Sequence, residues 1–118
     1  MKNIIFYSYQ KCSTCRKALR WLEHNNVNYK LIDIVKEPPS RKFLELAFTQ
    51  FSLDIKKIFN TRGKSYKLID IDILNLPTDE IFELLSNDGR LIKRPFLIIN
   101  ESKLLLGFNE SEYIANLR

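Results

Sequence analysis

The sequence lacks the features that would place it in a membrane or on a secretory route. No apolar run approaches the roughly 20 residues that a membrane-spanning helix needs. The N-terminal apolar run is short and is broken by Ser8, Tyr9 and Gln10, without the longer apolar region and small-residue cleavage site of a signal peptide. We therefore expect a cytoplasmic protein with no membrane contact, where thiols are kept reduced.

Internal repeats, low-complexity segments and nucleic-acid-binding motifs are also absent. The 118 residues are 45% hydrophobic and 12% aromatic, which suits one ordered domain. Charge is uneven, because residues 1–67 carry 14 Lys/Arg and 5 Asp/Glu whereas residues 68–118 carry 5 and 9. A basic half favours oxyanions, glutathione or an acidic protein face, or it is simply a solvated surface. Without a nucleic-acid motif or a dense basic tract, we expect no direct nucleic-acid binding.

The order of hydrophobic patterns predicts an α/β protein. A strand, a helix that begins at Cys12 and a second strand form a βαβ unit with parallel strands. The expected strands and helices are strands at 3–9 and 29–35, helices at 12–26, 40–51, 53–60 and 76–89, a hairpin of strands at 95–100 and 103–107, and a helix at 109–117. The order β-α-β, helices, β-β-α is that of a thioredoxin-like fold. We expect a single domain, 1–118, with a helical insertion at about 36–93.

Several residues mark where these elements begin and turn. Ser40 and Thr78 are placed as N-caps, and Asn109 with Glu112 has the spacing of a capping box. Gly63 is one of only three glycines in the chain, and it predicts a turn with positive φ.

The two cysteines, Cys12 and Cys15, are two residues apart in CSTC at the start of the first helix. Cys15 begins an apolar row with Ala18, Leu19 and Leu22 at helical spacing, so it should face the core. Cys12 lies about one turn earlier, at the N-terminal end of the helix, where backbone N–H groups have no intrahelical partners. The helical phase therefore makes the two thiols inequivalent.

A thiolate at Cys12 would gain from the helix N-terminus and from the positive charges of Lys11 and Arg16. Such surroundings can lower a thiol pKa from about 8.5 to roughly 3.5–7.5. Cys12 is then the attacking thiol, and Cys15 the candidate resolving thiol that closes a disulfide. Two alternatives stay open: an unreactive pair of small residues, and half of a metal site. Zinc usually has four ligands, and the sole other soft candidate is His24, which suits a surface position better.

Two further segments carry candidate site residues. In a thioredoxin-type fold, Pro95 stands where a cis-proline faces the cysteine helix, and Arg94 would then hold an oxyanion or carboxylate near Cys12. Asn60 and Arg62, with nearby backbone N–H groups, could bind an anion, or they could belong to a solvated surface turn.

With these residues in view, the chain resembles the arsenate-reductase-like family, which includes the ArsC arsenate reductases and the Spx transcriptional regulators. The resemblance covers essentially the whole chain, and its specificity comes from four segments in this order and at this spacing. The segments are KCSTCRKALRWLE (11–23), IFNTRGKSYK (58–67), LLSNDGRLIKRP (84–95) and LLGFNESEY (105–113).

The resemblance implies two kinds of function. In the arsenate reductases a cysteine that Cys12 matches attacks arsenate, arginines hold the oxyanion, and glutathione with glutaredoxin completes the cycle. Arg94 matches one of those arginines, whereas Asn60 and Gly107 stand in place of two others, with Arg62 as a possible substitute. Spx proteins carry the C-x-x-C pair, and its disulfide biases their binding to the C-terminal domain of the RNA polymerase α-subunit.

The sequence therefore predicts a thiol-dependent oxidoreductase of this family, acting on an oxyanion or disulfide substrate. Cys12, Cys15 and Arg94 are its expected catalytic residues, Lys11 and Arg16 stabilise the thiolate, and Asn60, Arg62 and Pro95 shape the anion site. We expect no metal or organic cofactor, a monomer, and electrons from glutathione, glutaredoxin or thioredoxin. The alternative is a redox-sensing regulator that binds the RNA polymerase α-subunit without turnover.

Overall fold

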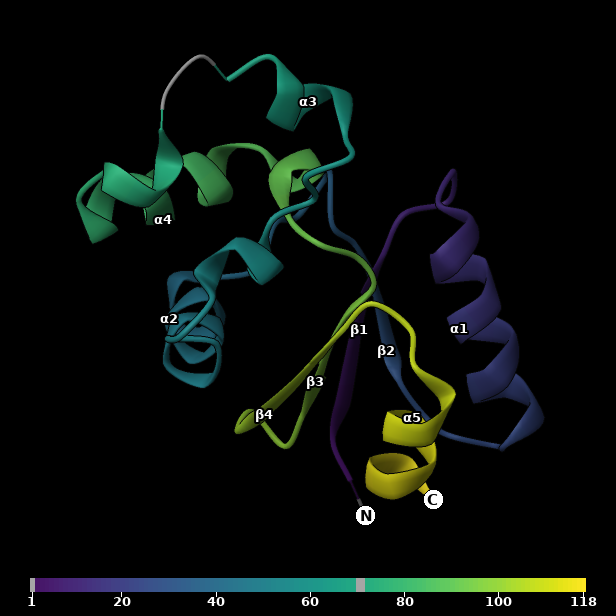
Figure 1. The fold of residues 1–118 in the computed structure, drawn as a ribbon. Helices are drawn as coiled ribbons and strands as arrows, with labels where there is room; N and C mark the ends of the chain where they lie inside the picture. The colour runs from purple at the N-terminus through teal and green to yellow at the C-terminus, as the bar shows by residue number, and fades with distance from the viewer. Residues whose placement is uncertain (1, 70–71) are drawn as a thin grey trace. The chain divides into compact units, whose positions relative to one another are not determined.

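The structure, a computed structural model, describes residues 2–69 and 72–118, which form two compact units (Figure 1). The sheet unit consists of Met1–Asp33 and Arg94–Arg118, and the helical unit is Ile34–Lys93. Within the described residues, no helix is both long and apolar enough to cross a membrane.

The sheet unit contains a four-stranded sheet and two helices. Its elements are β1 (Ile4–Ser8), α1 (Ser13–His24), β2 (Lys30–Asp33), β3 (Phe96–Ile99), β4 (Lys103–Leu106) and α5 (Glu110–Leu117). The strands lie in the order β2-β1-β3-β4. β1 pairs with β2 in parallel, whereas β1 with β3 and β3 with β4 pair antiparallel. This arrangement confirms the predicted α/β class and the β-α-β and β-β-α order.

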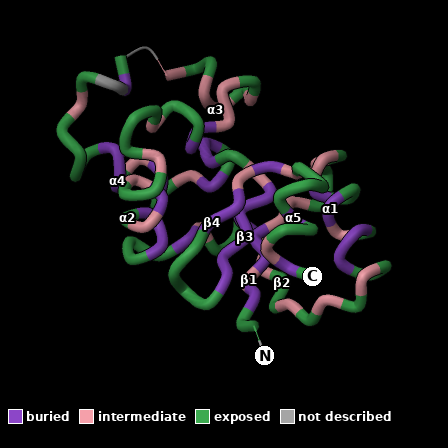
Figure 2. The backbone as a smooth tube through the Cα atoms, turned by 60° about the horizontal axis from the view of Figure 1, so that its bottom comes forward, coloured by how far each residue is buried: buried purple, intermediate pink, exposed green. Residues whose placement is uncertain are grey.

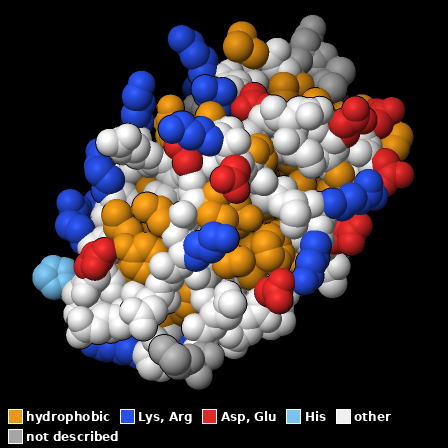
Figure 3. All heavy atoms as spheres, turned by 180° about the vertical axis from the view of Figure 1, so that it is seen from behind, with side chains coloured by type: hydrophobic (Ala, Val, Ile, Leu, Met, Phe, Trp, Pro, Cys, Tyr) orange, Lys and Arg blue, Asp and Glu red, His pale blue; other side chains and the backbone are white. Residues whose placement is uncertain are grey.

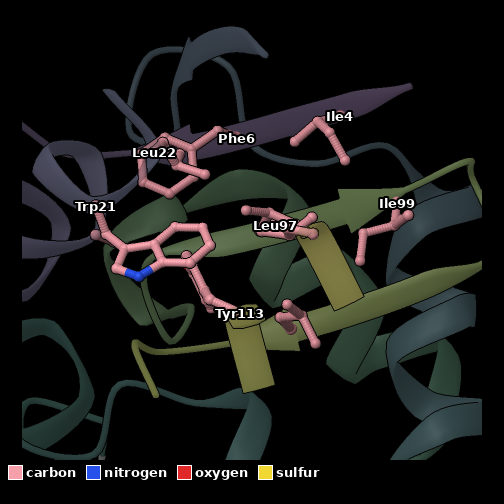
Figure 4. Close-up of a cluster of buried hydrophobic side chains, with 10 residues drawn as sticks. Ile4, Phe6, Trp21, Leu22, Leu97, Ile99 and Tyr113 are labelled. Atoms are coloured by element: carbon pink, nitrogen blue, oxygen red, sulfur yellow. The ribbon is translucent and has the colours of Figure 1, made fainter. Parts of the chain in front are cut away.

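The core of the sheet unit lies on the face of the sheet that α1 and α5 cover. Phe6 and Leu97 are paired on adjacent strands, and they meet Leu22 of α1 and Tyr113 of α5 in one buried cluster (Figure 4). Trp21 also belongs to it, with its ring edge-on to Tyr113 at 5.4 Å between centroids. Burial of each such side chain stabilises the fold by about 1.5–3 kcal/mol. This packing fixes α1, and with it the cysteines, against the sheet.

The ends of α1 follow from its local sequence. The helix starts after Cys12, and its apolar row places Cys15, Ala18 and Leu22 in the core, as predicted. At its other end Asn26 adopts a positive φ of 54°, and the Val27 N–H donates to the Leu22 carbonyl at 3.0 Å. A left-handed residue with such a bond commonly ends a helix.

The hairpin between β3 and β4 turns one residue earlier than the sequence suggested. Asn100 and Glu101 occupy the turn, with φ values of 51° and 55°. Two successive positive φ values are typical of the tight turns that join twisted antiparallel strands. Asparagine tolerates this conformation well, and the sequence contains no glycine here that would have signalled it.

The helical unit is built of short elements. They are α2 (Arg41–Gln50), a 3-10 helix (Ile55–Ile58), α3 (Lys64–Lys67), a 3-10 helix (Ile73–Asn75), α4 (Thr78–Asn87) and a 3-10 helix (Gly89–Leu91). The predicted helix at 53–60 is thus a single 3-10 turn, and α3 was not predicted. Phe48 of α2 packs on Phe82 of α4, with 4.6 Å between ring centroids, and the buried positions of both helices are visible in Figure 2.

The predicted caps are confirmed in part. The Asn109 side chain accepts a hydrogen bond from the Glu112 N–H at 3.1 Å, as expected for the start of α5. Ser40 stands at the N-cap of α2, but its side chain makes no capping hydrogen bond. The prediction for Thr78 is wrong, because Thr78 is the first residue of α4 and Pro77 is its N-cap. Proline suits this position because its ring favours a φ close to the observed −56° and its nitrogen carries no hydrogen that would need an acceptor.

A glycine is needed at position 63 because the chain passes close to Asn60, and not because the backbone adopts a positive φ. The prediction of a positive-φ turn is wrong, since its φ is −74°. A Cβ at this position would lie 2.6 Å from the Asn60 Nδ2. Gly89 shows the same effect more strongly, because a Cβ there would lie 1.9 Å from the Ile34 carbonyl oxygen. Both glycines allow the chain to approach itself within the helical unit.

Candidate functional site

Cys12 lies at the N-cap of α1, between β1 and the first helical turn. Its backbone is extended, with φ −96° and ψ 115°, and its N–H donates to the Tyr9 carbonyl at 3.0 Å. The Cys12 Sγ accepts a hydrogen bond from the Cys15 N–H at 3.3 Å. Sulfur here takes the place of the side-chain oxygen that usually caps a helix. The cap therefore holds Sγ against N–H groups at the positive end of the helix.

These surroundings lower the pKa of the Cys12 thiol to about 5. The largest cause is the hydrogen bond from the Cys15 side chain to the Cys12 sulfur. The Cys15 backbone N–H, and then a hydrogen bond and positive charge from Arg94, act in the same direction, whereas burial opposes them. Cys12 is half-buried, so the sulfur remains accessible to a reactant. At neutral pH Cys12 is a thiolate.

Cys15 has the opposite character. It is 1% exposed, and its pKa is raised strongly, first by its hydrogen bond to Cys12, then by burial and by the negative charge on Cys12. A backbone hydrogen bond at Tyr9 and the Ser8 side chain oppose this shift in part. No disulfide joins Cys12 and Cys15. The pair therefore consists of one thiolate and one buried thiol that donates to it.

Arg94 brings a positive charge to the same place from the start of β3. The Arg94-Pro95 peptide bond is cis, as the sequence predicted, and the Pro95 carbonyl accepts from the Gly107 N–H at 2.9 Å. The Arg94 guanidinium lies over the Tyr9 ring, 5.1 Å from its centroid. Within the described residues its Nε and Nη1 are buried without hydrogen-bond partners. A guanidinium with unused donors beside a thiolate can hold an anionic group of a reactant.

Lys11 and Arg16 flank the cysteines but do not figure among the groups that shift the Cys12 pKa. Both side chains are exposed, and the Arg16 Nη1 donates to the Gln10 carbonyl at 2.9 Å. Their role in stabilising the thiolate stays a prediction.

Asn60 and Arg62 belong to the helical unit, whereas the cysteines belong to the sheet unit. The Asn60 N–H donates to the Leu91 carbonyl at 2.7 Å, and its side-chain amide donates to the Arg90 carbonyl at 3.5 Å. Arg62 is exposed on the turn before α3. A role for either residue in anion binding stays a prediction.

Two tyrosines of the site were not predicted. Tyr9 packs against Arg94 and accepts from Cys12, and its signal in the sequence is an aromatic residue three positions before the cysteine. Tyr113 is fully buried, and its hydroxyl has no hydrogen-bond partner among the described residues. Burial is the largest cause that raises the Tyr113 pKa, and the negative charge of Glu112 acts in the same direction. Its phenol therefore stays protonated, with a donor directed into the core.

An apolar hollow adjoins the loop before Cys12. Its volume is about 450 Å³, and Tyr9, Arg16, Leu19 and Leu31 contribute to its lining. Leu31, on the edge strand β2, is 56% exposed. Other hydrophobic side chains also reach the surface, between basic and acidic ones (Figure 3). Cys12 is not among its lining residues, but such a hollow can take an apolar part of a ligand.

The described residues contain no cluster of three or more His, Cys, Asp and Glu side chains placed to hold a metal ion. His24, the further soft ligand considered from the sequence, is exposed at the last turn of α1.

Comparison with known proteins gives similarity over nearly the whole chain. The sequence profile of the ArsC family matches residues 7–116. An uncharacterized protein of Bacillus subtilis, YusI, is 40% identical over 116 residues, or 97% of this chain and 98% of that protein. The global transcriptional regulator Spx of Listeria monocytogenes is 35% identical over 111 residues, or 92% of this chain and 82% of Spx.

Solved structures agree with these sequence matches. The crystal structure of a possible arsenate reductase from Streptococcus mutans has a TM-score of 0.87 and 36% identity, covering 98% of this chain and 99% of that one. This likeness confirms the predicted thioredoxin-like fold with helices between its two halves.

Proposed function

Because the chain belongs to the ArsC family, we propose that it is a thiol-dependent oxidoreductase that acts through Cys12 and Cys15 on an oxyanion or disulfide substrate. The observation that carries this proposal is the asymmetry of the pair. The Cys12 sulfur lies half-buried at the helix end, where it accepts from the Cys15 N–H, and the buried Cys15 thiol is hydrogen-bonded to it. This is the arrangement that an attacking and a resolving thiol require.

With a disulfide substrate, the reaction takes two exchange steps. The Cys12 thiolate attacks one substrate sulfur, the substrate S–S bond breaks, and the other sulfur leaves as a thiolate that takes up a proton. Cys15 then loses its proton and attacks the Cys12 sulfur, which closes the Cys12–Cys15 disulfide and releases the second substrate thiol. Two electrons pass from the cysteine pair to the substrate. A reductant of the thiol class must then restore the pair.

The pKa of Cys15 suits this order of events. Cys12 raises that pKa both through its hydrogen bond and through its negative charge. Both effects disappear once the Cys12 sulfur is bonded to the substrate. Cys15 therefore becomes easier to deprotonate only after the first step, when it is needed.

Arg94 supports an anionic substrate in this scheme. Its unused Nε and Nη1 donors can orient a carboxylate of a glutathione-like disulfide, or the oxygens of an oxyanion, beside the thiolate. We further propose that the protein works as a monomer in the cytoplasm, with electrons from glutathione, glutaredoxin or thioredoxin.

A trapping experiment tests the proposal. The Cys15→Ser variant keeps the attacking thiolate but lacks the resolving thiol, so glutathione disulfide should leave a stable glutathione adduct on Cys12, visible by mass spectrometry. The wild-type chain should instead end as the intramolecular disulfide, with both glutathione molecules released. If Cys15→Ser forms no adduct, or forms it at a residue other than Cys12, the proposed chemistry is wrong.

The alternative function is a redox-sensing regulator that binds the C-terminal domain of the RNA polymerase α-subunit. The 35% identity to an Spx regulator favours it, because that similarity spans 92% of this chain. Purified α-subunit domain should then bind with an affinity that differs between the reduced chain and its Cys12–Cys15 disulfide. Equal or absent binding in both states, together with turnover of a disulfide substrate, would exclude this alternative.

A further inference from the structure

A hollow between α1 and α5, here named the basic groove, lies apart from the cysteine site. Its volume is about 490 Å³. Its lining includes Lys17, Arg20, Trp21 and His24 from α1, Ile114 from α5, and Arg118, which follows α5. The two helices lie beside each other on one face of the sheet (Figure 1). The groove belongs wholly to the sheet unit.

The lining residues of the hollow recur at helical spacing along α1. Positions 17, 20, 21 and 24 form one stripe along α1, positions 110 and 114 lie one turn apart on α5, and residue 118 follows the end of α5. Cys15, Ala18 and Leu22 lie on the core side of α1 and belong to a different face of that helix. A groove with two helical walls is the shape in which a third, amphipathic helix packs.

The floor of the groove is apolar and firmly held. Trp21 is 8% exposed and packs edge-on against Tyr113, and Phe108 also packs edge-on against Tyr113 at 4.9 Å between centroids. Ile114 is 38% exposed, so part of its side chain is open to a partner. Aliphatic side chains of a partner can be buried on this floor without displacing it.

The rim of the groove is mainly positive. The lining contains three positively charged side chains, Lys17, Arg20 and Arg118, and one carboxylate side chain, Glu110. In residues 2–69 and 72–118, none of these three cations forms a salt bridge. The three cations therefore lack an ion-pair partner within the described residues, and they complement acidic groups on either side of an apolar anchor.

We propose that the basic groove binds an acidic amphipathic helix of a partner protein. Apolar side chains at i, i+3 or i+4 and i+7 of that helix would contact Trp21 and Ile114, and flanking carboxylates would meet Lys17, Arg20 and Arg118. Nucleic acid fits the groove less well, because Trp21 is held edge-on and almost buried, which leaves no open aromatic face for a base to stack on. The inference does not depend on the thiol chemistry.

Trp21 makes this proposal directly measurable, since it is the sole tryptophan of the chain. The probe is a synthetic helical peptide of about four turns with leucines on one face and glutamates on both flanks. A companion peptide carries glutamine in place of every glutamate. Titration of the full chain should change the Trp21 fluorescence saturably, and the glutamate peptide should bind about tenfold tighter than the glutamine peptide at low salt.

Two charge-reversal variants of matched charge separate the groove from general electrostatics. Lys17→Glu with Arg20→Glu should weaken the glutamate peptide by about tenfold or more. The control, Lys30→Glu with Lys103→Glu, changes exposed lysines of β2 and β4 and should weaken it by no more than about twofold. Circular dichroism of both variants checks that they fold alike.

The proposal is overturned if the glutamate peptide produces no saturable change, or if both charge-reversal variants weaken it equally. It is also overturned if the two peptides bind equally well, since the rim would then contribute nothing. Tighter binding of an oligo-dT strand, lost in the Lys17 and Arg20 variant, would assign the groove to nucleic acid instead. Ile114→Ala should weaken the glutamate peptide by several-fold without changing the rim charges.

Discussion

In the sheet unit, the candidate site is built from a helix end, a strand start and a half-buried arginine, whereas in the helical unit the candidate anion-binding residues lie on an exposed turn. Cys12 stands at the N-cap of α1, and the Arg94 guanidinium lies over the Tyr9 ring. The Asn60 amide instead bonds to a carbonyl of its own unit, and Arg62 is exposed. Low exposure strengthens electrostatic effects, and exposure to water screens them.

The two units also differ in net charge and in how closely segments of the backbone pack against neighbouring atoms. The sheet unit has nine Lys/Arg and five Asp/Glu, whereas the helical unit has ten and nine. The helical unit contains both glycines at which a Cβ would be too close to a neighbour, Gly63 and Gly89. The comparison indicates that changes of reactivity should arise mainly in the sheet unit, and changes of stability without loss of reactivity in the helical unit.

The largest effect is expected from Cys12→Ser. A serine hydroxyl is not ionised at neutral pH, so the rate of reduction of a disulfide substrate should fall by roughly 10³-fold or more. The measurement is release of thiol from an aromatic disulfide reagent, followed by absorbance. Cys15→Ser should keep the first, fast release of thiol, and equal loss in both variants would contradict the separate roles of the two cysteines.

A large effect on stability is expected from Gly89→Ala in the helical unit. Its Cβ would lie 1.9 Å from the Ile34 carbonyl oxygen, and both groups are backbone, so the chain must shift. We expect a loss of about 2–3 kcal/mol in the free energy of unfolding, measured with urea. The matched control is Gly63→Ala. Its Cβ would lie 2.6 Å from the movable Asn60 side-chain amide and 3.3 Å from the Asn60 carbonyl oxygen, so this change should cost less than about 1 kcal/mol. Equal costs would show that backbone closeness is not the cause.

An intermediate effect is expected on the pH dependence of Cys12. The hydrogen bond from the Cys15 side chain is the largest single cause of the lowered Cys12 pKa, and Arg94 adds a smaller hydrogen bond and a positive charge. Cys15→Ala should therefore move the midpoint of Cys12 alkylation upward by about one pH unit or more, and Arg94→Gln should move it upward by less. A larger effect of Arg94→Gln than of Cys15→Ala would reverse the assigned order of causes.

The lowered pKa of Cys12 in the folded chain also predicts how the free energy of unfolding depends on pH. The Cys12 pKa is lower in the folded than in the unfolded chain, so between those two values the unfolded chain binds more protons at this position. Its contribution to the free energy of unfolding is present above the unfolded pKa and is lost as pH falls towards about 5. Urea unfolding of wild type and Cys12→Ser between about pH 6 and pH 8 should show a steeper rise of stability with pH in the wild type.

The smallest effect is expected from Arg62→Ala. Its guanidinium is exposed on the turn before α3, so water should screen most of its influence on an anion. The rate with glutathione disulfide should change by no more than about threefold, against about tenfold or more for Arg94→Ala. A loss with Arg62→Ala as large as with Arg94→Ala would show that the helical unit contributes to the site after all.

Much of the sheet unit could be predicted from local patterns. The apolar row of α1 identified Cys15 as the inner thiol, and Pro95 was correctly expected to follow a cis bond. The helical unit was harder, because its short 3-10 helices and α3 carry too few residues for a periodic pattern. Gly63 was misread because a glycine signals either positive φ or close approach, and only tertiary contacts distinguish the two.

Some parts of the site depend on contacts between segments far apart in sequence. The position of Arg94 over Tyr9 joins residues more than eighty positions apart, and no local pattern encodes it. The basic neighbours of Cys12 suggested that Lys11 and Arg16 lower its pKa, whereas the hydrogen bond from the Cys15 side chain is the largest cause. That bond depends on the rotamers of two side chains, which spacing alone does not determine.

The pH dependence of alkylation at Cys12 tests the central claim most directly. Iodoacetamide is allowed to react with the reduced chain over a range of pH, and the modified residue is identified by mass spectrometry. An activated thiolate predicts a rate that rises with a midpoint at about pH 5, with Cys15 unmodified because it is buried. A midpoint near that of free cysteine, about 8.5, would contradict the account.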